Sequence, residues 1–392
     1  MSKYRLQSTV FVLVAFLLGC NEFMVVGVLS DIAKSYSASL SAVGFLVTSF
    51  AIIYAICTPL ITMLTSRFNR FKVLMTLLLV FLLGNTLTAL APNLFWLFVS
   101  RILTAAVAGS IISLILVFVS IVAPMEKRAM LVAATFAGFS IATIVGVPIG
   151  TAISNVASWR LSFLLISFLT IVVGGLLFWL TPKHTQQASS NLGNQLNLLT
   201  DRRIYLGIVV MIALMTAEYT FYTYIRPIIT TVLGFSNTQL SFLLGLVGIT
   251  FILGNTCAGI IVNHFGITKL TWISAGVFVL LLLMDSVFKV AWMGIALLCL
   301  ICFLLGMPGS ILQVMFLNVA DRDYPQAINL SSSLNPICTN IGVSLGSLTA
   351  SISVNFLTIG QIGYIGALFA LIAIISSHCL INVSTQSKQT KE

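Results

Sequence analysis

The stretch TVFVLVAFLLGCNEFMVVGVL, residues 9–29, decides the fold class of this protein. It is as long as the roughly 20 apolar residues that an α-helix needs to cross a lipid bilayer, and Glu22 is its only charged residue. Lys3 and Arg5 precede it, as in a secretory signal peptide, but Asn21 and Glu22 occupy the place where small residues would form a cleavage site. We therefore expect an uncleaved first membrane span.

The rest of the chain has the same character. Of 392 residues, 59% are hydrophobic and 7% are charged, whereas soluble domains contain about 25% charged residues. This composition excludes a soluble enzyme and a disordered chain, and the apolar runs are too long for barrel strands of about 10 residues. Twelve spans are predicted, at 9–29, 42–65, 73–91, 94–122, 129–152, 161–181, 204–232, 239–262, 270–288, 291–312, 327–354 and 360–383.

The net charge of +10 indicates orientation in a membrane rather than nucleic-acid binding. If both termini lie in the cytoplasm, most of the 19 Lys and Arg residues fall in cytoplasmic loops, as the positive-inside rule requires. We therefore predict a multi-pass protein of the cell (cytoplasmic) membrane with both termini cytoplasmic.

The two halves of the sequence repeat with an offset of 196 residues. Glu22-Phe23 corresponds to Glu218-Tyr219, and Gly146-Val147-Pro148-Ile149-Gly150 corresponds to Gly342-Val343-Ser344-Leu345-Gly346. Two parallel six-span halves are an architecture of alternating-access transporters. The predicted fold is therefore an all-α membrane protein of twelve transmembrane helices in two pseudo-symmetric six-helix halves. We expect the halves at 1–182 and 204–392, joined by a cytoplasmic linker at 183–203.

The loop after the second span carries a family resemblance. It reads Thr62-Met63-Leu64-Thr65-Ser66-Arg67-Phe68-Asn69-Arg70-Phe71-Lys72, which resembles the signature G-x-x-x-D-R-x-G-R-x-x of the major facilitator superfamily. Residues 259–266, GIIVNHFG, resemble it in the second half. Ser66 and Asn263 replace the two Asp residues of the pattern, so the acid that would gate against the basic residues is missing in both halves. Arg67, Arg70 and Lys72 remain, and the resemblance implies a conformational role for them.

Other segments narrow the resemblance to the twelve-span drug:proton antiporter group. The similar segments are Asn21-Glu22-Phe23, Ser100-Arg101, Gly146-x-Pro148-x-Gly150, Trp159-Arg160-x-x-Phe163 and Tyr222-Thr223-Tyr224-x-x-Pro227. Within that group the chain resembles the arabinose/sugar-efflux, purine-efflux and chloramphenicol-exporter branch. The resemblance implies a proton-coupled efflux transporter, an antiporter of drug-like or nucleobase/sugar-like molecules that works by alternating access.

Few ionisable residues lie inside the predicted spans, and they are the candidates for proton coupling. Glu22 and Glu218 lie at matching depths of equivalent spans, and a carboxylate so deep in a bilayer is costly to keep charged. Asp31 is a further proton-coupling candidate, and Arg101 is the expected charge partner of Glu22 or Asp31. A structural hydrogen-bonded carboxylate is the alternative for both Glu residues. For Arg226 the sequence favours a role at the outer membrane boundary.

The candidate substrate-binding residues are Phe23, Tyr219, Tyr222 and Asn335, which lie in the spans near the two carboxylates or supply a polar group there. For the aromatic residues, contact with lipid is the alternative. The conformational candidates Gly146, Pro148, Gly150, Gly342 and Gly346 allow close helix approach and bending. Ordinary small-residue packing is the alternative for these.

Two other classes of function remain to be weighed. A facilitator or importer of a polar nutrient, such as a sugar or nucleoside, stays open, although few Asn and Gln residues lie in the spans. A membrane enzyme is disfavoured because the spans contain no His/Asp cluster and no Ser/His pair. The seven Cys lie in apolar runs, so no metal, no cofactor and no catalytic residue is expected. The expected partners are a small-molecule substrate, protons and the lipid bilayer, without nucleic acid, for a monomeric protein.

Overall fold

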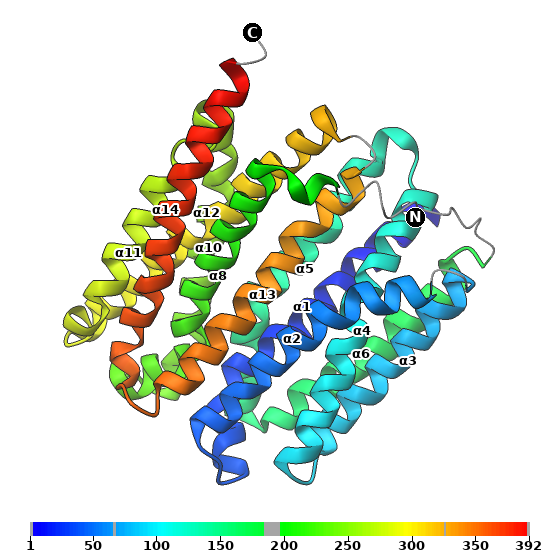
Figure 1. Ribbon diagram of the computed structural model, residues 1–392. Coiled ribbons are helices and arrows are strands. Elements are labelled where there is room, and N and C mark those ends of the chain that lie inside the picture. Colours follow the sequence, from blue (N-terminus) through cyan, green and yellow to red (C-terminus); the bar gives the residue numbers. More distant parts are fainter. Residues whose placement is uncertain (1–2, 66–67, 184–196, 325–326, 390–392) are drawn as a thin grey trace. The chain divides into compact units, whose positions relative to one another are not determined.

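The structure, a computed structural model, describes residues 3–65, 68–183, 197–324 and 327–389 (Figure 1). Twelve long helices lie within these ranges. They are α1 (Lys3–Ser35), α2 (Leu40–Thr65), α3 (Arg70–Leu90), α4 (Leu94–Val122), α5 (Met125–Val156), α6 (Trp159–Leu180), α8 (Arg202–Tyr222), α10 (Asn237–Phe265), α11 (Leu270–Val287), α12 (Ala291–Asp323), α13 (Ile328–Ser353) and α14 (Gly363–Gln389).

The long helices have the composition of membrane spans. Over the described residues, ten of them are long and apolar enough to cross a bilayer, and α5 and α13 are the other two. Large apolar side chains such as Phe95, Phe168 and Trp179 are exposed on helix surfaces. A soluble protein would bury these groups, whereas a lipid environment accommodates them. The predicted all-α membrane fold is confirmed.

The seventh predicted span, 204–232, is not one continuous helix. Helix α8 ends at Tyr222, and a three-residue helix α9 (Ile225–Pro227) and a π-helical turn η2 (Ile228–Val232) follow. Pro227 has no backbone N–H, and its ring would clash with the carbonyl of Thr223 in a regular helix. The predicted span thus consists of three helical segments, and the sequence prediction did not include the break between them.

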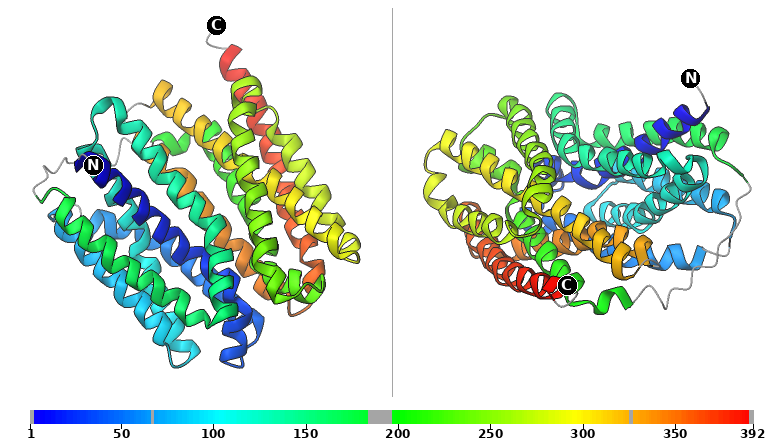
Figure 2. Two further views of the ribbon diagram at one scale, coloured as in Figure 1. Left: turned by 180° about the vertical axis from the view of Figure 1, so that it is seen from behind. Right: turned by 90° about the horizontal axis from the view of Figure 1, so that it is seen from above.

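The helices form two compact units. One unit contains α1 to α6, and the other contains α8, α11 to α14 and most of α10. In the first unit α1 packs against α5 and α6, and in the second α8 packs against α13 and α14 (Figures 1 and 2). Helix α3 packs on α4 and α6, just as α11 packs on α12 and α14. The same internal packing thus recurs in both units.

Glycine contacts agree with the 196-residue offset. A Cβ at Gly146 would lie 3.2 Å from the Cα of Cys20 on α1, and a Cβ at Gly342 would lie 3.2 Å from the backbone nitrogen of Thr216 on α8. Cys20 and Thr216 are themselves 196 residues apart. The close approach of the first and fifth helices of each unit therefore occurs at equivalent positions.

Helices α1 and α8 are enclosed by their neighbours. Every residue from Leu17 to Leu29 is buried, and so is every residue from Ala213 to Phe221. This enclosure places Glu22 and Glu218 inside their units and away from the lipid-facing surface.

Candidate functional site

Glu22 lies in the middle of the enclosed part of α1. Its side chain is 6% exposed, and neither carboxylate oxygen has a hydrogen-bond partner within the described residues. Arg101 of α4 and Tyr54 of α2 are within electrostatic reach of it. A buried carboxylate without donors is costly in its charged form, so this environment favours the neutral acid.

Arg101 is fully buried beside Glu22 and does not bind its carboxylate. Its Nη1 donates to the backbone oxygen of Asn21 at 2.9 Å and to Asn21 Oδ1 at 2.6 Å, and its Nη2 donates to the backbone oxygen of Glu22 at 3.4 Å. The guanidinium carbon lies 4.4 Å from the ring centre of Phe50 and 5.6 Å from that of Phe163. The structure thus brings the predicted charge partner next to Glu22, where it is held by neutral groups.

Asp31 lies further along α1 and is half-buried. Its carboxylate accepts a short hydrogen bond from the hydroxyl of Ser154 on α5. This contact joins the first and fifth helices of the unit, so Asp31 has a hydrogen-bond donor that Glu22 lacks.

Glu218 is the counterpart of Glu22 in the second unit. It is 5% exposed, and its Oε2 has no hydrogen-bond partner within the described residues. Tyr222 and Cys302 are within electrostatic reach. Helix α12, which packs in the second unit as α4 does in the first, contains no Lys or Arg from Ala291 to Ala320. Within the described residues, α12 therefore supplies Glu218 with no counterpart of Arg101.

The candidate aromatic residues lie in two different settings. Phe23 is buried within the first unit, where its ring packs edge-on against Phe139 of α5 with a centroid distance of 6.2 Å. In the second unit the rings of Tyr219 and Tyr222 lie 5.6 Å apart, and Tyr222 is half-buried. The two tyrosines form an aromatic pair on the helix that carries Glu218.

Asn335 bridges two helices of the second unit. Its Nδ2 donates to the backbone oxygen of Gly309 on α12 at 2.9 Å, and its Oδ1 accepts a hydrogen bond from Thr339 at 3.3 Å. Both polar ends of this amide thus have protein partners, which fix its orientation.

The glycine motif lies where α5 approaches α1. Gly150 packs on Met24. At the equivalent Gly346, an added Cβ would lie 2.8 Å from the Cβ of Tyr219. Pro148 lies inside α5 without ending it. These contacts show close small-residue packing within each unit.

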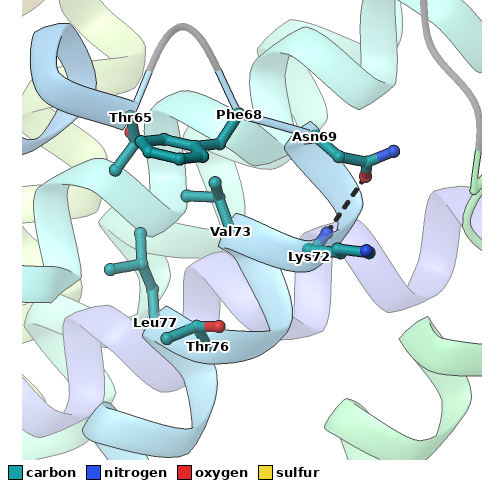
Figure 3. Close-up of a pocket in the computed structure, with 7 residues that line it drawn as sticks. All are labelled: Thr65, Phe68, Asn69, Lys72, Val73, Thr76 and Leu77. Atoms are coloured by element: carbon teal, nitrogen blue, oxygen red, sulfur yellow. Dashed lines mark hydrogen bonds between the residues drawn. The ribbon is translucent and has the colours of Figure 1, made fainter.

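The basic loop residues lie beside an open hollow in the first unit. Arg70 is half-buried, Lys72 is exposed, and Arg67 lies outside the described residues. The hollow measures about 440 Å³ (Figure 3), and it is lined by Thr65, Phe68, Asn69, Lys72, Val73, Thr76 and Leu77. Asn69 caps α3 by accepting the backbone N–H groups of Phe71 and Lys72. Neither Glu22 nor Glu218 is among the residues that line this hollow.

Several functional candidates were missed by reasoning from the sequence. Asn21 precedes Glu22 in an apolar run, and that polar neighbour was the available signal. The outer-boundary role favoured for Arg226 was wrong, because its side chain is only 4% exposed and therefore lies inside the protein.

An ion-pair network at the start of α8 was also missed. Arg203 Nη2 lies 2.6 Å from carboxylate oxygens of both Asp201 and Asp323. Burial raises the pKa of the Asp201 carboxyl, but hydrogen bonds from Arg203 outweigh burial and hold that pKa below its ordinary value. Asp201 is two residues from Arg203, but Asp323 is 120 residues away, so no local pattern could reveal its part in the network.

The described residues contain no group of three or more His, Cys, Asp or Glu side chains arranged to hold a metal ion. The arrangement that remains is a pair of buried carboxylates in two equivalent helices, one with a buried cation beside it. Such groups in membrane helices typically mark ion or substrate paths.

Comparison with known proteins identifies the family of the chain. The family model described as Major Facilitator Superfamily matches residues 11–347, and the chain belongs to that family of membrane transporters. It is therefore a transporter and not an enzyme.

Individual relatives are similar over most of their length. The Bacillus subtilis (strain 168) protein named "Uncharacterized MFS-type transporter YtbD" is 27% identical over 368 residues, which cover 92% of this chain and 91% of that protein. The Escherichia coli (strain K12) "Inner membrane transport protein YdhP" is 33% identical over 245 residues, which cover 62% and 63%. The crystal structure of a bacterial homologue of the human lysosomal transporter Spinster, inward-facing and unoccupied, has the same fold, with a TM-score of 0.74 at 15% identity over 97% of this chain and 93% of that one.

Proposed function

We propose that this transporter is a proton-coupled exporter of small organic molecules, with Glu22 as its main proton-binding group. The observation that carries the proposal is the buried Glu22 carboxylate, whose oxygens accept no hydrogen bond within the described residues. A charge at the bilayer centre costs at least about 2.5–3.5 kcal/mol, and binding a proton removes that cost. Glu22 is therefore suited to load and release protons during a transport cycle.

Coupling follows from competition at this site. A protonated Glu22 leaves Arg101 with its neutral partners, whereas a deprotonated Glu22 attracts Arg101 or a cationic group of the cargo. When proton and cargo exclude each other, each shifts the population toward the conformation that it binds, which is sufficient for antiport. Glu218 and Asp31 are the secondary candidates for the same role.

The cargo in this proposal is drug-like or nucleobase/sugar-like. Tyr219 and Tyr222 supply an aromatic surface beside Glu218, and Phe23 and Asn335 are further contact candidates. The glycine motifs around Gly146 and Gly342 supply the close helix approach that a rocking movement or a tight seal requires. The basic residues Arg67, Arg70 and Lys72 belong to the same conformational machinery.

The membrane orientation is also a proposal. Both termini lie in the cytoplasm, residues 1–182 and 204–392 are the two moving halves of a monomer, and 183–203 is their cytoplasmic linker. Single cysteines at Pro92 and Gln187, introduced into a cysteine-free background, test this orientation. Pro92→Cys should react with an impermeant thiol reagent from outside, and Gln187→Cys should react only after the cells are opened. Outside labelling of Gln187→Cys would show that the orientation is inverted.

The transport proposal is tested by accumulation assays against a panel of drugs, nucleobases and sugars. An exporter lowers the accumulation of its cargo in expressing cells, and a protonophore should remove the difference. Expressing cells that accumulate more of a sugar or nucleoside would instead identify a facilitator or importer. Glu22→Gln is the matched variant, because it keeps the shape of the side chain and removes its proton chemistry.

A further inference from the structure

We propose that Asn21 is a positioning residue that sets the proton affinity of Glu22 by holding Arg101 on neutral acceptors. This inference rests on the proposed role of Glu22 as the proton-binding group. Asn21 itself carries no charge and binds no proton, so it acts only through Arg101.

The geometry around Arg101 carries the inference. Asn21 provides two of the three hydrogen-bond acceptors that the guanidinium uses, one from its backbone and one from its side chain, and the side-chain bond is the shorter at 2.6 Å. The third acceptor is the backbone oxygen of Glu22, at 3.4 Å. The cation therefore reaches the main chain of Glu22 while its carboxylate oxygens stay without a partner.

The contact leaves the positive charge uncompensated. All three acceptors are neutral, and Phe50 and Phe163 add only the faces of their rings. The Nε of Arg101 and the Nδ2 of Asn21 have no hydrogen-bond partner within the described residues. The Arg101 guanidinium, bonded to neutral acceptors, would gain a stronger interaction if two of its N–H groups turned to a carboxylate. The Asn21 side chain binds Nη1, so it holds the guanidinium by that nitrogen while Nε and Nη2 have weaker or no bonds within the described residues.

The internal repeat provides an independent observation. The residue equivalent to Asn21 in the second half is Ala217, and α12 contains no Lys or Arg from Ala291 to Ala320. Glu22 and Glu218 are thus matched, but the asparagine and the arginine occur together in one unit and are absent together from the other. This pattern is the one expected if Asn21 serves Arg101 rather than the helix itself.

The direction of the effect follows from the groups that face Glu22. These are Arg101 from α4 and Tyr54 from α2. The neighbouring α6 places its basic residue Arg160 near Tyr36, at the end of α1, and α5 places Ser154 on Asp31. Movement of Arg101 is therefore the main electrostatic change that an uncharged Asn21 variant produces at Glu22.

Two variants of Asn21 should act in opposite directions. In Asn21→Ala the guanidinium loses its shortest bond and turns to the Glu22 carboxylate, which stabilises the charged form, so Glu22 releases its proton at lower pH. In Asn21→Asp the new carboxylate binds Arg101 and adds a negative charge beside Glu22, so Glu22 keeps its proton to higher pH. We expect shifts of about one pH unit each way, or about tenfold in proton affinity.

Infrared difference spectroscopy on the purified full-length protein measures the proton affinity of Glu22 without any cargo. The carbonyl band of protonated Glu22 is identified by its loss in Glu22→Gln, and its titration midpoint is followed in the wild type and in both Asn21 variants. The Asn21→Asp variant contains a second carboxyl group. The double variant Asn21→Asp with Glu22→Gln shows the band of the introduced acid alone, so that it can be subtracted from the band of Glu22. Asn340→Ala is the matched control, because Asn340 is a buried amide whose Nδ2 donates to the backbone oxygen of Pro336 in its own helix.

Opposite shifts in the two Asn21 variants, with none in Asn340→Ala, support the inference. Equal midpoints in all variants would overturn it and leave the proton-binding role of Glu22 intact, because the band would still titrate. Loss of the band at all pH values in the wild type would overturn both the inference and the proposed role of Glu22. If Asn21→Ala does not fold, the isosteric Asp variant still decides, since an unchanged or lowered midpoint there contradicts the inference.

Discussion

Glu22 and Glu218 occupy equivalent positions in two units that pack alike, yet the groups around the two carboxylates differ. Glu22 has the buried guanidinium of Arg101 beside it, held by Asn21, whereas Glu218 has Tyr222 and Cys302 beside it and no counterpart of that cation. The same helix geometry therefore supports two kinds of carboxylate site. In our proposal the first is tuned by a cation that belongs to the protein, and the second depends on a proton or on a cation that arrives with the cargo.

The largest effect on transport should follow from removing the cation beside Glu22, which makes the Glu22 site resemble the Glu218 site. Arg101→Leu removes the buried positive charge beside Glu22, so Glu22 should hold its proton well above neutral pH and fail to release it. We expect proton-driven transport at neutral pH to fall at least about tenfold, which corresponds to a shift of one pH unit or more. Transport by purified protein in proteoliposomes, measured across a pH series, checks this.

Arg101→Lys is the control for that experiment, because it keeps the charge and loses the forked hydrogen bonds. It should retain more transport than Arg101→Leu. If Arg101→Leu transports at the wild-type rate at every pH, then the cation plays no part in coupling, and the two carboxylates are equivalent in spite of their surroundings.

A smaller effect should distinguish the helix contacts of the two units. An added Cβ at Gly342 would collide with the Cβ of Met215 and lie 3.0 Å from the backbone oxygen of Ile212, whereas at Gly146 the nearest atom is 3.2 Å away. Gly342→Ala should therefore destabilise the protein by about 1–3 kcal/mol, and Gly146→Ala by less. Thermal unfolding in detergent measures both variants.

Gly174→Ala is the control for the glycine variants, because nothing lies within 4 Å of a Cβ at that helical position. It should be neutral or stabilise the protein by up to about 1 kcal/mol, since Ala favours the helix over Gly. Equal losses for Gly146→Ala and Gly342→Ala would mean that the two interfaces are equally tight.

The smallest effect concerns contacts near the N-terminal end of the first helix of each unit, α1 and α8. Gln7 Nε2 donates to the backbone oxygen of Leu180 in the first unit, whereas the equivalent Arg203 binds Asp201 and Asp323 in the second. The pKa of Asp201 is held below its ordinary value, so its contribution to stability is present at neutral pH and is lost as pH falls below about 4. Arg203→Gln should cost about 1 kcal/mol near pH 7 and little at acid pH.

Melting temperatures at the two pH values check this prediction, with Gln7→Ala as the comparison from the first unit. The effect of Gln7→Ala should not depend on pH, because a neutral amide has no proton to gain. A pH-independent loss for Arg203→Gln would show that packing rather than charge accounts for the contact.

The sequence was sufficient for the fold because its main signals are long and local. Apolar runs such as 9–29 predicted the spans, and the matched pair of Gly146 and Gly342 predicted the internal repeat. The break after Tyr222 was missed although Pro227 marks it, because Pro59, Pro148 and Pro308 lie inside helices without ending them. A proline alone does not say whether neighbouring helices compensate for its missing bond.

The site was predictable only in its titratable residues. Glu22, Glu218 and Arg101 stand out because charge is rare in the spans, but a sequence does not show which acceptor an arginine chooses. The choice of Asn21 over the Glu22 carboxylate depends on side-chain geometry between helices that are 80 residues apart in the chain. Burial of Arg226 likewise depends on packing around η2, which a hydropathy pattern does not encode.

The most direct test of the central claim compares Glu22→Gln and Glu218→Gln in proteoliposomes, once a cargo is identified. Two rates are measured for each variant: accumulation driven by a pH gradient, and exchange of labelled for unlabelled cargo without a gradient. We predict that Glu22→Gln abolishes gradient-driven accumulation and retains exchange, while Glu218→Gln loses less of the proton drive. If Glu22→Gln accumulates cargo at the wild-type rate, coupling belongs to Glu218 or Asp31, and the assignment of Glu22 as the main proton-binding group is wrong.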